Sequence, residues 1–103
     1  MLTRRMDLPE LDPTAARLFL DYFRAEAAKH RKPFTFGCGL AQWDTEGRYV
    51  ALQEGDVGQG PVTWRIVRSP EGSLVELVCL AESEALCQEA GAFVTRALGH
   101  AMN

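Results

Sequence analysis

The sequence lacks the features that would assign it to several specialised classes of protein. It has no apolar run near the ~20 residues of a membrane-spanning helix, no low-complexity tract and no internal repeat. Its three cysteines are an odd number without a C-x-x-C pair, which favours reduced thiols over a disulfide scaffold. Residues 1–7 contain no apolar segment of a secretory signal. We therefore expect a cytoplasmic protein that does not contact membranes.

Motifs for catalysis or cofactor binding are also scarce. The two histidines, His30 and His100, stand at expected helix ends without a triad signature, and the spacing of His and Cys matches no zinc module. The glycines of residues 55–60 superficially resemble a phosphate-binding loop, but a strand follows where such a loop needs a helix. The sequence therefore predicts no catalytic residue, no cofactor and no metal ion, and we do not expect an enzyme.

The composition is that of one folded domain. The chain has 103 residues, of which 47% are hydrophobic and 24% charged, and a chain of this size buries roughly 65% of its unfolded surface on folding. We predict a single α+β domain over residues 1–103, in which residues 1–11 form a flexible N-terminal arm.

Turn-forming segments divide the middle of the chain into strands. They are Asp-Thr-Glu-Gly at 44–47, a glycine-rich stretch at 55–61 and Ser-Pro-Glu-Gly at 69–72. Four segments with alternating apolar residues surround these turns, which predicts a four-stranded antiparallel sheet. The segment 69–72 has Pro and Gly where a tight turn requires them, so the last two strands are expected to form a hairpin.

Helical patterns lie on both sides of the strands. Asp12 is suited to cap a helix that has Pro13 at its first position, and Pro33 prevents its continuation, so the first helix is predicted from Pro13 to His30. A second helix with one apolar stripe is predicted over residues 82–100. The predicted order of elements is αββββα.

Apolar residues on both faces of the strands indicate a partner. Two helices fully cover only one face of such a sheet, and a small monomer rarely exposes several hundred Å² of contiguous apolar surface. We therefore predict a homodimer through sheet faces or edges; the alternative is that the helices cover opposite faces of a monomer. The residues predicted to bind a partner are Trp43, Tyr49, Trp64, Tyr22 and Arg24.

The charges of the chain are unevenly distributed. The net charge is −3, but residues 1–32 carry seven basic against five acidic residues, and the remainder carries four against nine. A nucleic-acid-binding module would use the basic residues of the first helix and its end, which are Arg17, Arg24, Lys29, Arg31 and Lys32. The acidic isoelectric point of about 5.3 opposes this alternative. A capping role at the negative end of the helix dipole is the preferred interpretation of Lys29, Arg31 and Lys32.

No motif identifies a family. The order of elements is similar in architecture to secretion-chaperone-like and other small dimeric adaptor folds, which implies a chaperone-like role. We predict a small non-enzymatic protein-binding, regulatory or adaptor module that acts as a homodimer. A small-ligand-binding protein or thiol enzyme would need a pocket near Cys38, Trp43 and Trp64, whereas we expect Cys38 to be buried and unreactive.

Overall fold

The computed structural model describes residues 2–6, 8–54 and 60–102, with the backbone alone for residues 49–54. Within these residues there are five strands and two helices. In chain order they are β1 (Leu2–Met6), α1 (Pro13–Lys29), β2 (Phe34–Trp43), β3 (Tyr49–Glu54), β4 (Val62–Arg68), β5 (Leu74–Ala81) and α2 (Glu84–Met102). The α+β class predicted from the sequence is confirmed.

Both helices begin at side-chain caps. The Asp12 carboxylate accepts a hydrogen bond of 2.8 Å from the backbone N–H of Ala15, and Pro13 takes the first position of α1. The Ser83 hydroxyl accepts one of 3.3 Å from the backbone N–H of Leu86. These groups satisfy N–H donors that have no partner within the helix. The predicted start of α1 is confirmed, and α2 begins two residues later than predicted.

Two of the predicted turns form hairpins. Gly47 between β2 and β3 has a φ of 80°, and Gly72 between β4 and β5 has a φ of 96°, both in the region that favours glycine. The Gly72 N–H donates to the Ser69 carbonyl at 2.9 Å, which closes the turn between β4 and β5. The predicted hairpin of the last two strands is confirmed.

The sheet is mixed, so the prediction of a purely antiparallel sheet was wrong. The strand order is β1-β5-β4-β2-β3, and β2 runs parallel to β4 while the other neighbouring pairs are antiparallel. The strands β3 and β4 are consecutive in the chain, yet β2 lies between them. A simple meander would have placed β3 beside β4.

The length of the connection between β3 and β4 permits this arrangement. Residues 55–61 are seven in number, so they can extend over at most about 23–25 Å. Two inter-strand spacings amount to only about 10 Å. A connection of this length does not force its two strands to be neighbours, as a two-residue turn would. The local sequence therefore left the choice between the two sides of β2 open.

The N-terminal segment is a strand of the sheet. Leu2–Met6, which the sequence analysis assigned to a flexible arm, forms β1 and pairs with β5 antiparallel, with Arg4 opposite Cys79. This pairing gives hydrogen-bond partners to the backbone groups of β5 on the side away from β4. The sheet therefore has one strand more than predicted, among the residues that the structure describes.

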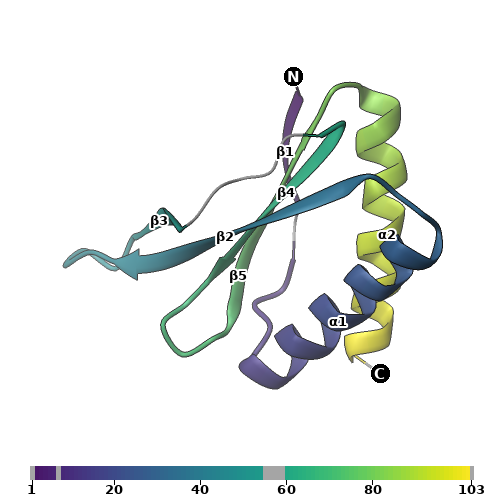
Figure 1. Ribbon diagram of the computed structural model, residues 1–103. Coiled ribbons are helices and arrows are strands. Elements are labelled where there is room, and N and C mark those ends of the chain that lie inside the picture. The colour runs from purple at the N-terminus through teal and green to yellow at the C-terminus, as the bar shows by residue number, and fades with distance from the viewer. Residues whose placement is uncertain (1, 7, 55–59, 103) are drawn as a thin grey trace.

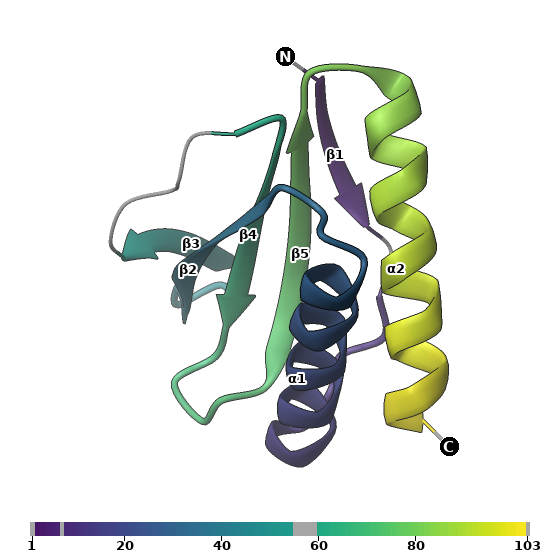
Figure 2. The same ribbon diagram turned by 45° about the vertical axis from the view of Figure 1, so that its right-hand side comes forward.

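The helices α1 and α2 lie on the same side of the sheet (Figures 1 and 2). An aromatic cluster joins α1 to the strands beneath it. The Phe23 ring centre lies 5.4 Å from that of Phe36 in β2 and 5.2 Å from that of Trp64 in β4, both edge to face. Phe34 in turn lies 5.5 Å from Phe93 of α2. Such pairs add to the stabilisation from apolar burial.

The opposite face of the sheet has no helix among the described residues, but much of it is still buried. Val67 and Val78 on this face are 0% and 5% exposed. Arg5 and Glu76 form an ion pair of 3.2 Å here, in which the Glu76 side chain is largely buried. Burial within one chain weakens the argument that this face requires a partner.

Phe23 is expected to be essential for stability. Its side chain is fully buried and contacts aromatic rings from α1, β2 and β4, so Phe23→Ala should lower the free energy of unfolding by about 3–5 kcal/mol. Urea unfolding followed by circular dichroism measures this. The control Leu18→Ala removes a side chain that is 42% exposed and should change stability by about 0.5 kcal/mol or less. Equal effects of the two substitutions would contradict the packing described.

Candidate functional site

The β2–β3 hairpin extends past the layer of helices (Figure 1). Phe34 and Phe36 at the start of β2 are partly buried against the core, whereas Trp43 at its end is 48% exposed. Trp43 faces Tyr49 in the register of the hairpin. The hairpin therefore carries a large aromatic side chain away from the body of the protein.

The turn of this hairpin is held by Asp44. Its carboxylate accepts hydrogen bonds of 2.9 Å from the backbone N–H groups of Glu46 and Arg48, and the Arg48 side chain pairs with both Asp44 and Glu46. A carboxylate that accepts backbone hydrogen bonds in this way fixes the path of a tight turn. The strand positions on either side of the turn, Trp43 included, are therefore preorganised.

The residues predicted to bind a partner do not form one surface. Trp64 was misplaced: its side chain is fully buried in the core beneath α1 and cannot contact a partner. Tyr22 stacks on His100 of α2 with ring centres 4.4 Å apart, and the Arg24 guanidinium lies 5.3 Å from the Phe36 ring centre. The side chain of Tyr49 lies outside the described residues. Of this set, Trp43 and Tyr49 belong to the projecting hairpin, and only Trp43 has a described side chain there.

An ion pair reduces the positive charge of the surface that a nucleic-acid-binding module would use. Lys32 pairs with Glu89 of α2, which neutralises its charge locally. Arg17, Lys29 and Arg31 are exposed on α1 or just after it. Arg31 has a φ of 55°, so it follows the helix in a left-handed conformation. Lys29 lies in the last turn of α1, where a cation stabilises the helix dipole, as the preferred interpretation predicts.

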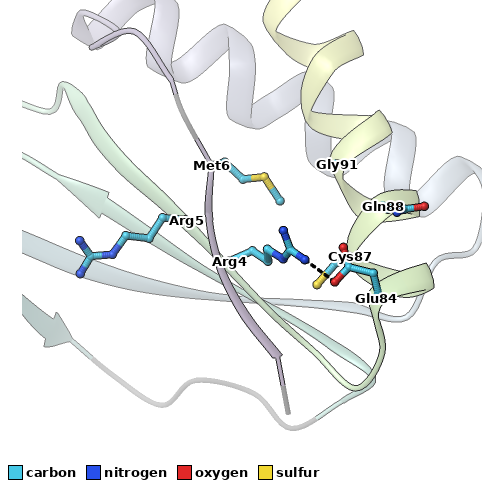
Figure 3. Close-up of a pocket in the computed structure, with 7 residues that line it drawn as sticks. All are labelled: Arg4, Arg5, Met6, Glu84, Cys87, Gln88 and Gly91. Atoms are coloured by element: carbon cyan, nitrogen blue, oxygen red, sulfur yellow. Dashed lines mark hydrogen bonds and ion pairs between the residues drawn. The ribbon is translucent and has the colours of Figure 1, made fainter.

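A depression of about 270 Å³ lies between β1 and α2 (Figure 3). The residues that line it are Arg4, Arg5, Met6, Glu84, Cys87, Gln88 and Gly91. An ion pair between Arg4 and Glu84 joins the two elements beside Cys87. Sequence reasoning missed this site because β1 was expected to be an arm; the only local signal is the weak alternation of residues 2–6.

The cysteines lie in two different environments. Cys38 is exposed, so the prediction that it is buried was wrong: its face of β2 is covered by α1 only as far as Phe36. Cys79 and Cys87 are buried. Burial, with smaller contributions from Cys87, raises the pKa of the Cys79 thiol to about 12. Trp64 lies inside the core whereas Cys38 and Trp43 are exposed, so the three residues proposed for a thiol site do not meet at one surface.

The two histidines pack at the interface between the helices. The His30 ring centre lies 5.7 Å from that of Phe93, and His30 is 3.4 Å from the Glu26 carboxylate. His100 stacks on Tyr22. Both histidines therefore have structural contacts at helix ends, as the sequence indicated.

Residues 2–6, 8–54 and 60–102 contain neither a metal-binding cluster nor a helix suited to cross a membrane. No group of three His, Cys, Asp or Glu side chains in this part of the chain is arranged to hold a metal ion. No described helix combines the length and apolar character that crossing a membrane requires.

Comparisons with protein families, with curated proteins and with solved structures found no match.

Stability at alkaline pH should depend on Cys79. Its pKa is 9.0 when unperturbed and about 12 in the fold, so the unfolded chain loses the proton first as pH rises. The stability due to protonated Cys79 is therefore fully present below pH 9 and is lost between pH 9 and 12, by up to about 1.4 kcal/mol per pH unit. Urea unfolding at pH 8, 9 and 10 under reducing conditions should show a steeper decline for the parent than for Cys79→Ala. Cys38→Ala serves as the control and should keep the parental slope.

Nucleic-acid binding is expected to be absent at physiological salt. Fluorescence anisotropy with DNA and RNA measures it for the parent and for a variant in which Arg17, Arg24, Lys29 and Arg31 are Gln, while the ion-paired Lys32 is kept. A complex that weakens steeply between ~50 and ~200 mM salt and disappears in the variant would contradict this expectation, because each phosphate contact contributes about 0.7–0.9 to the log–log salt slope.

Proposed function

We propose that the protein is a small non-enzymatic protein-binding module that acts as a homodimer through its β2–β3 hairpin. The observation that carries the proposal is Trp43, which is 48% exposed at the end of a hairpin projecting past the helices. Tryptophan is among the residues that most often dominate the binding energy of protein interfaces. The chaperone-like role and cytoplasmic location remain predictions from the sequence.

The contacts that hold the turn of the hairpin support its use in binding. Two backbone hydrogen bonds to Asp44 and the ion pairs of Arg48 hold the turn before any partner arrives. Association loses less conformational entropy when the contacting element is already ordered. Burial of the exposed part of the Trp43 indole then contributes to affinity. Little conformational entropy is lost, because the turn of the hairpin is already ordered.

The two outer strands of the sheet differ in how they are protected against pairing with a strand of another molecule. The strand β1 has Arg4 and Arg5, each in an ion pair with a glutamate. The strand β3 reads Tyr-Val-Ala-Leu-Gln-Glu, with no basic residue and no proline, and its one charged residue stands at the end. Sheet edges without such protection tend to pair with another strand. This difference supports β3 as the edge that meets the partner.

A second copy of this chain is the partner that the edge favours. Antiparallel pairing of β3 with its symmetry mate is isologous, since each chain presents the same residues to the other, and two-fold dimers of this kind are the commonest oligomers. Trp43 lies on the neighbouring strand, opposite the first residue of β3, and is therefore one strand away from the paired edges.

The expected mass in solution is twice that of the 11.4 kDa chain. Size-exclusion chromatography with light scattering at micromolar concentration measures it. A strictly monomeric mass even at high concentration would refute the homodimer. A dimer that survives in the variants below would instead show that the interface lies elsewhere.

Two substitutions test the interface. Val50→Lys places a charge on the β3 edge, and Trp43→Ala removes the exposed indole; truncation of an interface hot spot costs at least about 2 kcal/mol, so the dimer dissociation constant should rise about 30-fold or more. Sedimentation over a dilution series measures the constants. Leu18→Ala is the matched control, because Leu18 is similarly exposed, at 42%, but lies on α1. Circular dichroism verifies that each variant is folded.

A further inference from the structure

Two buried cysteines meet between the sheet and α2. Cys79 of β5 is 0% exposed and Cys87 of α2 is 4% exposed, and both belong to the same core cluster. Cys87 lies close enough to contribute to the raised pKa of the Cys79 thiol. They are only eight residues apart in sequence, because a short connection links the end of β5 to the start of α2.

The surroundings of this thiol pair combine three elements. Arg4 of β1 stands directly opposite Cys79 in the strand register. Glu84 precedes Cys87 by three residues, so the two lie on the same side of α2 about one turn apart. The ion pair between Arg4 and Glu84 therefore spans from β1 to α2 next to the thiols, as Figure 3 shows for Cys87.

Access to the two sulfur atoms is unequal. Cys87 lines the open depression between β1 and α2, whereas Cys79 is not among the residues that line it. A molecule as small as hydrogen peroxide can approach Cys87 from the depression, while a bulky thiol reagent is hindered by the 4% exposure of this residue. The depression therefore distinguishes Cys87 as the first cysteine to react.

We propose that Cys79 and Cys87 form a redox pair that closes to a disulfide between β5 and α2 on reaction with hydrogen peroxide. This proposal is independent of the proposed function. In the first step the Cys87 sulfur attacks one peroxide oxygen, the O–O bond breaks, and sulfenic acid and one water are formed. In the second step the Cys79 sulfur attacks the Cys87 sulfur, the S–O bond breaks, and the hydroxide leaves as water with the Cys79 proton. Two thiols lose two electrons and two protons, and peroxide is reduced to two waters.

The environment of Cys79 disfavours it as the first cysteine to react. Its pKa of about 12, raised by burial and by Cys87, keeps it protonated and poorly reactive toward external reagents at neutral pH. Its proton is then available to the departing hydroxide. The exposed Cys38 lies on β2, which is separated from β1 by β5 and β4 in the sheet. It is therefore expected to react separately.

Peptide mapping tests the proposal directly. The Cys38→Ala variant is treated with hydrogen peroxide, blocked with an alkylating reagent and digested at glutamates, which cuts after Glu82 and Glu84 and so separates the two cysteines. The expected product is peptide 77–82 joined to peptide 85–89, with loss of two hydrogens and reversal by dithiothreitol. Recovery of both peptides alkylated, at peroxide concentrations that oxidise Cys38 in the parent protein, would overturn the proposal.

Single variants test the order of the two steps. In Cys79→Ala, dimedone should trap a sulfenic acid on Cys87, whereas in Cys87→Ala the thiol of Cys79 should remain unmodified. A dimedone adduct on Cys79 and none on Cys87 would overturn the assigned order. The mapping experiment does not use these single variants, so its result does not depend on how well they fold. Light scattering on the oxidised protein reports its oligomeric state, so the disulfide and the homodimer are tested separately.

Discussion

The packing of Phe23 against the sheet is the interaction on which the rest of the structure depends. Its ring contacts Phe36 of β2 and Trp64 of β4, so one side chain fixes α1 across the two parallel strands. The contact between Phe34 and Phe93 extends the cluster to α2. Because the helix layer covers only the first part of β2, the remainder of that strand and β3 project from the body. The exposed hairpin is thus a consequence of where the aromatic packing ends.

Much of the uneven charge of the chain is used internally. The Arg4–Glu84 pair joins β1 to α2, and the Lys32–Glu89 pair joins the end of α1 to the same helix. Each exposed pair contributes at most about 1 kcal/mol, so these contacts orient elements more than they stabilise the fold. The basic first third and the acidic remainder of the sequence therefore meet within one molecule, which leaves fewer basic side chains for an external polyanion.

The hairpin and the thiol pair are associated with opposite edges of the sheet. The order β1-β5-β4-β2-β3 places the Arg4 side of the sheet, with Cys79 and Cys87, away from β3. A disulfide at one edge would tie α2 to β5 without any direct contact with Trp43. The two proposals can accordingly be tested separately on the same protein.

Features that depend only on neighbouring residues follow from the sequence alone. Asp12 with Pro13 set the start of α1, and Gly47 and Gly72 set two turns, because capping and positive φ are local requirements. The pairing of β1, the parallel contact of β2 with β4, the burial of Trp64 and the exposure of Cys38 depended on the tertiary structure. A strand with alternating apolar residues can pair with either of two neighbouring strands, and either of its faces can turn toward the helices. Only packing against the helices decided which strands meet, which aromatic side chains are buried and which cysteines are buried.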